Sequence, residues 1–195
     1  MRTSRLEAFS DGVIAILITI MVLELKTPAG HEWSDLRPLV PIISSYVLSF
    51  IYLGIYWNNH HHMIHLTDRV SGSVLWANLH LLFWLSLVPF ATAWVGEAHL
   101  AALPVAVYGF VFMMAGTAYF ILKTRLIAAQ GPHSALAEAL GSDFKGKISV
   151  LLYLVAIPLA YVSVWLSLAI YAGVAAMWLV PDSRIEKRVS HHHRS

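Results

Sequence analysis

The 195-residue chain has the composition of an integral membrane protein. Hydrophobic residues make up 58% of it and Asp, Glu, Lys and Arg only 12%, whereas charged residues form about a quarter of a typical soluble domain. The net charge of +2 is too small to indicate a nucleic-acid partner, and the absence of cysteine excludes disulfides, thiol catalysis and thiolate metal sites. Most of the surface is therefore expected to face a lipid bilayer or other helices.

Six membrane-spanning helices are expected from the lengths of the apolar runs. A bilayer core of roughly 30 Å is crossed by about 20 helical residues, and polar stretches divide the chain on that scale. The last apolar run is too long for one span, so we expect a hairpin that turns near residues 162–165, with its first helix beginning early at Phe144. The expected unit is residues 1–183, with spans at about 6–25, 38–57, 73–95, 100–122, 145–163 and 164–181, followed by a basic cytoplasmic tail at 184–195.

Basic residues are distributed unequally between the two sides of these six spans. Two of them, Lys26 and Arg37, lie on the side opposite the chain termini. The positive-inside rule therefore predicts a cell-membrane protein with both termini in the cytoplasm. An odd number of spans would move the basic tail outside, so the asymmetry also favours six. The basic residues on the terminus side are Arg2, Arg5, Arg69, Lys123, Arg125, Lys145, Lys147, Arg184, Lys187, Arg188 and Arg194.

The first span contains an acidic residue, Asp11, about one turn inside an otherwise apolar segment. An ionisable side chain at that depth in a membrane helix indicates a functional site. Because successive helical residues are about 100° apart, bulky apolar side chains form a stripe on one side of this helix, and Asp11 points about 140° away from Ile16. The stripe consists of Phe9, Ile16, Ile20 and Leu23, with Thr19 beside it.

Ordinary structural roles also account for both features. An apolar stripe on a membrane helix usually contacts lipid or neighbouring helices, and Ser10 and Asp11 are favourable N-cap residues for a helix that begins at residue 11. Arg5 and Asp11 lie too far apart around one straight helix to pair with each other. If both side chains have partners, those partners belong to another helix or another subunit.

Several motifs along the chain resemble one known family. The opening Arg5-x-x-x-Phe9-Ser10-Asp11 is similar to the signature of the prokaryotic homologues of transmembrane protein 175, the endosomal and lysosomal potassium channel. The likeness covers nearly the whole chain, because further similar motifs follow: Tyr56-Trp57-x-Asn59-His60-His61, Trp76-x-Asn78-x-x-Leu81, Pro89-Phe90 and Trp178-x-x-Pro181-Asp182.

The resemblance implies a potassium-permeable homotetramer in which the first of six helices in each subunit lines a central pore. On the matching positions it implies a hydrophobic gate at Ile16, Ile20 and Leu23 and a selectivity-linked hydroxyl layer at Thr19. Modest selectivity is expected, because the chain has no TVGYG-like carbonyl filter. No cofactor is expected, and potassium is the permeant ion. The first helix would be held by a network with the expected members Arg5, Phe9, Ser10, Asp11, Trp76, Asn78 and His80.

Other functions have weaker support in the sequence. A proton-coupled transporter that uses Asp11 is the main alternative, although transporters usually show repeated halves and broken helices. A metal site is less favoured than a solvated cluster, or hydrogen bonding to the first helix, for His60, His61, His62 and His65, because zinc needs three or four ordered ligands. Their titration between pH 5 and 8 is compatible with pH sensitivity. A membrane metalloenzyme would also need this cluster, and the spans contain no nucleophile with its base and no phosphate loop, so no enzymatic activity is expected.

Overall fold

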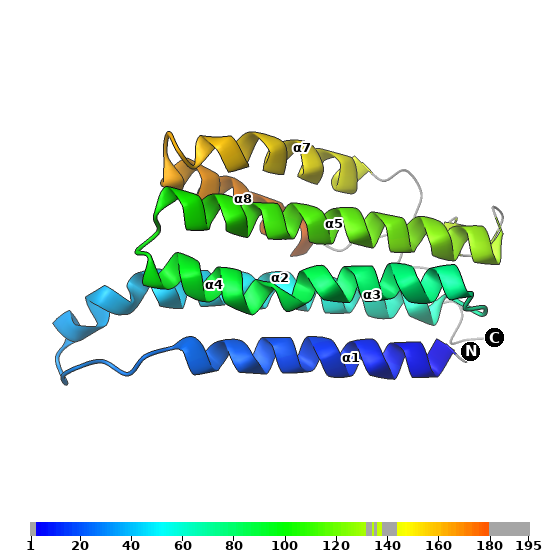
Figure 1. The fold of residues 1–195 in the computed structure, drawn as a ribbon, viewed down its shortest axis with the longest axis horizontal. Helices are drawn as coiled ribbons and strands as arrows, with labels where there is room; N and C mark the ends of the chain where they lie inside the picture. The colour runs from blue at the N-terminus through cyan, green and yellow to red at the C-terminus, as the bar shows by residue number, and fades with distance from the viewer. Residues whose placement is uncertain (1–2, 132–133, 135, 138–143, 180–195) are drawn as a thin grey trace.

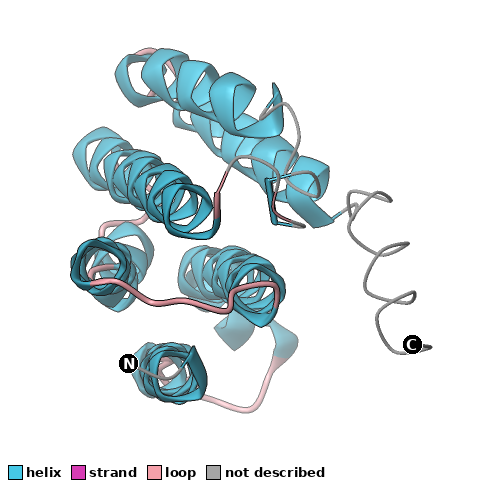
Figure 2. Ribbon diagram, turned by 90° about the vertical axis from the view of Figure 1, so that its right-hand side faces the viewer, coloured by secondary structure: helices cyan, strands magenta, loops and turns pink. Residues whose placement is uncertain are grey.

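The computed structural model describes residues 3–131, 134, 136–137 and 144–179, and the regular elements in these ranges are helices. The helices lie side by side along one bundle axis, with α1 at one edge and α7 at the opposite edge (Figures 1 and 2). The elements are α1 (Thr3–Ile20), η1 (Met21–Glu24), η2 (Trp33–Leu39), α2 (Val40–His65), α3 (Gly72–Ser86), α4 (Val88–Glu97), α5 (Ala102–Gln130), α7 (Phe144–Leu159) and α8 (Val164–Leu179). When η1 is counted with α1, η2 with α2 and α3 with α4, these helices form six segments, which confirms the predicted all-α fold with six helices.

Four of the six segments are long and apolar enough, by length and composition, to cross a membrane. The other two, α7 and α8, have 16 residues each and form a hairpin with its turn at residues 160–163. A 16-residue helix is about 24 Å long, which is shorter than the bilayer core of roughly 30 Å. The turn residues add to the length of this hairpin. The four long segments are Thr3–Glu24, Trp33–His65, Gly72–Glu97 and Ala102–Gln130.

Two helices continue beyond the ends expected from hydropathy. The helix α2 continues to His65, beyond the expected end of the second span at residue 57, and α5 continues to Gln130, beyond the expected end of the fourth span at residue 122. Hydropathy marks where a chain leaves the lipid, whereas a helix ends where its backbone conformation changes. After α5 that change occurs at Gly131, whose φ of 100° lies in the left-handed region that glycine adopts readily.

The third expected span consists of two helices, α3 and α4, with a break at Leu87. Pro89, in the first turn of α4, has no backbone N–H, and its ring clashes with the carbonyl four residues earlier in a regular helix. At the break, the Leu87 N–H donates to the Trp84 carbonyl over 3.2 Å, a tighter turn than in an α-helix. The sequence therefore explains a local interruption inside an apolar run of spanning length.

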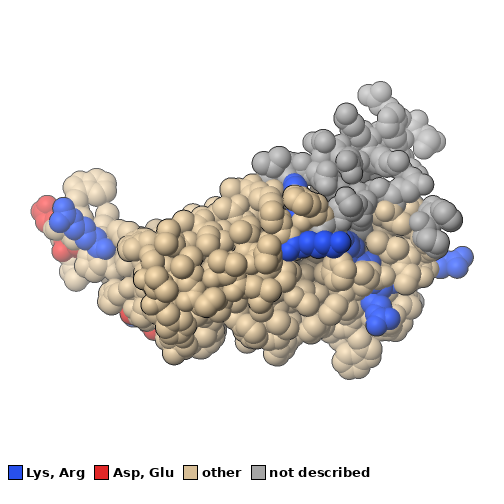
Figure 3. Space-filling model, turned by 90° about the horizontal axis from the view of Figure 1, so that it is seen from above, with Lys and Arg blue, Asp and Glu red and all other residues tan. Residues whose placement is uncertain are grey.

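Charged side chains lie toward the two ends of the bundle, with an uncharged band between them on the face shown in Figure 3. At the η1–η2 end, Lys26 and Glu97 form an ion pair of 2.8 Å, and the hydrogen bond from Lys26 to Glu97 raises the pKa of the lysine. The start of α1 and the end of α5 lie at the other end (Figure 1). Residues 180–195, which include the expected basic tail, lie outside the described residues.

Hydroxyl groups connect the helices inside the bundle. Ser49 of α2 lies 2.6 Å from the Thr92 hydroxyl of α4 and 3.0 Å from the Tyr108 hydroxyl of α5. Tyr52 of α2 donates to the Tyr171 carbonyl of α8 over 2.6 Å and accepts from Tyr153 of α7 over 2.8 Å. A bilayer core has no water to hydrogen-bond these hydroxyls, so they are tolerated there because they bond to other groups of the protein.

Glycine allows a close contact between α2 and α4. A Cβ atom on Gly96 would lie 2.7 Å from the Cα of Ile42, which is closer than real Cβ contacts. In α2 itself, a Cβ atom on Gly54 would meet nothing within 4 Å. The two glycines therefore differ in the space around them, although both are helical.

We expect Gly96→Ala to destabilise the protein and Gly54→Ala to stabilise it slightly. Overpacking costs about 1–3 kcal/mol, which outweighs the gain of about 1 kcal/mol from replacing a helical glycine by alanine. At Gly54 only the gain remains. Thermal unfolding in detergent, followed by circular dichroism, measures both effects. Equal shifts of the two midpoints would contradict this account of the α2–α4 contact.

Candidate functional site on the first helix

The first helix has one face packed inside the subunit and another that is exposed. The packed face of α1 and η1 consists of Leu6, Ser10, Ile14, Leu17 and Met21, all of which are buried. The apolar stripe predicted from the sequence lies on the exposed face, where the relative exposures are 52% for Phe9, 62% for Ile16, 45% for Ile20 and 77% for Leu23. The stripe therefore faces away from the other helices of its own subunit.

Thr19 lies on the same exposed side as the stripe. Its hydroxyl is 3.0 Å from the carbonyl oxygens of both Ala15 and Ile16, to which it donates its hydrogen. A hydroxyl that donates to its own helix still has two lone pairs with which to accept a hydrogen bond or to contact a cation. The Thr19 oxygen is thus an exposed electron-pair donor within an apolar surface.

The packed face of α1 is held by a buried chain of hydrogen bonds. Ser10 donates to the Leu6 carbonyl over 2.9 Å and accepts from the Asn78 amide nitrogen of α3, also over 2.9 Å. The Asn78 amide oxygen lies 2.8 Å from Nε2 of His60 in α2, so this nitrogen carries the proton. Ser10, His60 and Asn78 have no exposed surface. Three helices are therefore joined at one buried point.

Acidic residues of α1 are paired with aromatic side chains of α2. The indole nitrogen of Trp57 donates to Asp11 over 3.1 Å, and Nδ1 of His61 lies 3.0 Å from Glu7. Glu7 and Asp11 are four residues apart, as are Trp57 and His61, so each helix contributes two adjacent turns of one face. The Trp57 and His61 rings stack with centroids 6.1 Å apart. Asp11 thus contacts a neighbouring helix, on the side away from the stripe.

The other expected network members lie elsewhere. Arg5 is exposed and makes no hydrogen bond or ion pair with the described residues. Trp76 is 76% exposed, and His80 accepts a hydrogen bond of 3.0 Å from Trp84 within α3. Phe9 belongs to the exposed stripe. Of the three candidate partners named on the third span, the structure places Asn78 against Ser10.

Sequence reasoning named hydrogen bonding to the first helix as one role of the histidine cluster, but it paired no individual residue with Glu7, Trp57, His60 or His61. The signal that was present is the matching four-residue spacing of Glu7 with Asp11 and of Trp57 with His61. Among the described residues, no group of three or more His, Cys, Asp or Glu side chains is arranged to hold a metal ion. His60 and His61 instead contact Asn78 and Glu7, respectively.

Comparison with known proteins identifies the family. Residues 5–89, which include α1, α2 and α3, match the family described as endosomal/lysosomal potassium channel TMEM175. The chain is 52% identical over 187 residues to a potassium channel of Chryseobacterium sp., a match that covers 96% of this chain and 97% of that one. The chain belongs to the TMEM175 family.

Further relatives agree with this TMEM175 membership over most of the chain. A potassium channel of Streptomyces collinus is 33% identical over 190 residues, with 90% of each chain covered. The crystal structure of a lysosomal potassium-selective channel TMEM175 homolog from Chamaesiphon minutus superposes with a TM-score of 0.80 at 32% identity, covering 91% of this chain and 96% of that chain. These findings confirm the resemblance read from the motifs. The protein is a membrane protein of an ion-channel family, not an enzyme.

We expect Ser10→Ala to destabilise this TMEM175-family protein because it leaves the buried Asn78 amide without its acceptor. An unsatisfied buried donor costs about 1–3 kcal/mol. Ser44→Ala is the matched control, because the Ser44 hydroxyl is exposed and bonds to the Pro41 carbonyl of its own helix; it should change the free energy of unfolding by less than about 0.5 kcal/mol. Chemical denaturation in detergent compares the two. A similar loss of unfolding free energy in both variants would show that the buried Ser10–Asn78 hydrogen bond does not stabilise the protein.

Proposed function

We propose that four copies of this chain assemble into a potassium-permeable, modestly selective cation channel of the cell membrane, with α1 of each subunit lining a central pore. Both termini would lie in the cytoplasm. The observation that carries the proposal is the exposed stripe of α1, an apolar surface that includes one hydroxyl oxygen and faces away from its own subunit. Potassium is the permeant ion, and the mechanism uses no cofactor.

The stripe is better suited to a pore than to lipid because of Thr19. A lipid-facing surface gains nothing from an exposed oxygen, whereas a ring of four such oxygens replaces part of the water around a dehydrating cation. Closed rotational symmetry repeats the same patch around one axis. In such a ring Ile16, Thr19, Ile20 and Leu23 would form successive layers along the pore.

Gating and selectivity follow from these layers. Rings of branched apolar side chains close a narrow path by excluding water, so Ile16, Ile20 and Leu23 would act as a hydrophobic gate. The backbone carbonyls of α1 are used within the helix, so the filter would consist of side-chain hydroxyls and residual water. A ring of side-chain hydroxyls has a less rigid geometry than a cage of backbone carbonyls. We therefore expect only a modest preference for potassium over sodium.

We expect Ile16→Asn or Leu23→Ala to raise the conductance or to hold the pore open. Either change widens or wets the apolar constriction, which lowers the barrier for a hydrated cation. Leu151→Ala is the matched control, because Leu151 is 60% exposed on α7, at the edge of the bundle opposite α1. Single-channel recording in planar bilayers measures conductance and open probability. If Leu151→Ala has the same effect as Leu23→Ala, the stripe does not line the pore.

We expect Thr19→Val to bring the potassium and sodium permeabilities closer together. Valine keeps the shape of threonine but removes the oxygen that would contact the dehydrated ion. Thr19→Ser, which keeps a hydroxyl, should retain most of the preference. The shift of reversal potential under unequal potassium and sodium measures the permeability ratio. An unchanged ratio in Thr19→Val would exclude Thr19 from the selectivity layer.

A proton-coupled transporter that uses Asp11 remains the second candidate. Its support is the acidic group inside the first helix, but the hydrogen bond from Trp57 gives Asp11 a role in helix packing. The reversal potential of the purified protein in a bilayer with unequal potassium and sodium separates the two functions. A modestly selective channel gives a current whose reversal potential is shifted from zero toward the potassium equilibrium potential. Slow, saturable, proton-dependent uptake would establish the transporter and overturn the proposal.

A further inference from the structure

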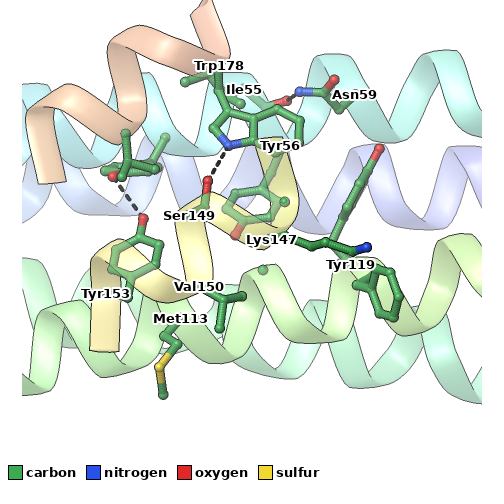
Figure 4. Close-up of a pocket in the computed structure, with 15 residues that line it drawn as sticks. Ile55, Tyr56, Asn59, Met113, Tyr119, Lys147, Ser149, Val150, Tyr153 and Trp178 are labelled. Atoms are coloured by element: carbon green, nitrogen blue, oxygen red, sulfur yellow. Dashed lines mark hydrogen bonds between the residues drawn. The ribbon is translucent and has the colours of Figure 1, made fainter. Parts of the chain in front are cut away.

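A pocket of about 330 Å³ lies between α2, α5, α7 and α8. Its volume is in the lower part of the range of small-molecule sites. Side chains from all four helices line it, and Trp178 of α8 donates to the Ser149 hydroxyl of α7 across 2.9 Å (Figure 4). The pocket is thus part of the packed bundle and is separate from the candidate pore surface.

The deep part of this pocket presents carbon surface although several tyrosines line it. The hydroxyls of Tyr52 and Tyr153 are bonded to each other, and Tyr52 also donates to the Tyr171 carbonyl. Tyr56 donates to the Phe112 carbonyl over 3.4 Å. Because these hydroxyls already have partners within the bundle, the aromatic rings, with Met113 beside them, are what a ligand would contact.

The mouth of the pocket carries a positive charge. Lys147, in the first turn of α7, is the charged residue among the described lining residues, and Figure 4 shows its side chain reaching toward Tyr119 of α5. Its ammonium group forms no ion pair or hydrogen bond with the part of the chain that the structure describes. Tyr153 lies six residues further along α7, about 9 Å deeper at 1.5 Å per residue. The pocket is therefore apolar inside and cationic at its opening.

We propose that this pocket binds an anionic glycerophospholipid, with one acyl chain among the aromatic rings and the phosphate at Lys147. Charge complementarity selects the headgroup, since a basic side chain at the membrane surface attracts anionic lipid. The place of the pocket along the α7–α8 hairpin favours a lipid over a soluble anion, since the pocket begins near the end of the hairpin and continues into its apolar part. The proposal concerns binding alone and is independent of the proposed pore.

Native mass spectrometry of the full-length protein in detergent tests the proposal with phosphatidylglycerol and phosphatidylcholine as probes. We expect one tightly retained phosphatidylglycerol per chain and weaker retention of phosphatidylcholine. Lys147→Gln should weaken phosphatidylglycerol binding about fivefold, the effect of one basic residue at a membrane surface, while Lys147→Arg keeps it. Arg37→Gln, which removes the same charge at the opposite end of the bundle, is the control and should have no effect.

The acyl-chain part of the site is tested at Gly116. A Cβ atom there would lie 3.6 Å from the Tyr56 hydroxyl, an ordinary contact, so Gly116→Ala is expected to retain lipid. Gly116→Leu extends a branched side chain from the pocket wall and should abolish retention. Equal retention of the two lipids, an unaffected Lys147→Gln variant, or displacement of phosphatidylglycerol by inorganic phosphate would each overturn the proposal.

A second measurement leaves Gly116 in place, so it does not depend on the folding of the Gly116→Leu variant. Bilayers of phosphatidylcholine are prepared with a small fraction of either lipid brominated on its acyl chains, and tryptophan fluorescence is recorded. The part of the quenching that is lost in the Trp178→Phe variant is assigned to lipid in the pocket, because Trp178 lines it. We expect this component to be larger with brominated phosphatidylglycerol than with brominated phosphatidylcholine. Equal quenching by the two lipids would overturn the proposal independently.

Discussion

The rotational setting of α1 depends on the hydrogen bond between Ser10 and Asn78. Both side chains are fully buried, and Asn78 also holds His60 of α2. Breaking the Ser10 bond would leave a buried N–H donor of Asn78 unsatisfied at a cost of about 1–3 kcal/mol, so a rotation of α1 that breaks this bond is opposed. Once Ser10 faces α3, helical geometry directs Phe9, Ile16, Ile20 and Leu23 away from the subunit. The orientation of the stripe is thus set by this polar contact together with the buried apolar residues on the same face of α1 and η1.

Contacts of α1 with α2, and of α2 with the other helices, support this setting. The Asp11–Trp57 and Glu7–His61 pairs hold α1 against α2 at its outer turns. The hydroxyl contacts of Ser49 and Tyr52 hold α2 against α4, α5, α7 and α8. The bundle therefore presents α1 at its edge as a helix with one fixed face, which is the requirement for the symmetric assembly proposed above.

The sequence predicted much of this fold because lipid imposes a simple rule on length and polarity. The number of helical segments and the two faces of α1 both followed from hydropathy and the helical period. The extensions of α2 and α5 did not, because polar residues continue a helix until the backbone changes, as at Gly131. The partner of Ser10 was narrowed to three residues of the third span but not chosen, because the choice depends on how α3 is rotated. The lipid pocket was missed, since its lining comes from four helices with no sequence motif in common.

The spacing of the paired side chains between α1 and α2 leaves the longitudinal register ambiguous. His65 follows His61 by one turn, and their rings stack with centroids 5.9 Å apart. A slide of α1 by one turn would place Asp11 opposite His61 and Glu7 opposite His65, which preserves two acid–ring pairs. The same slide would bring Ile14 to the Asn78 amide, and an aliphatic side chain accepts no hydrogen bond. A single hydroxyl among aliphatic neighbours thus removes the degeneracy between two otherwise similar alignments of the helices.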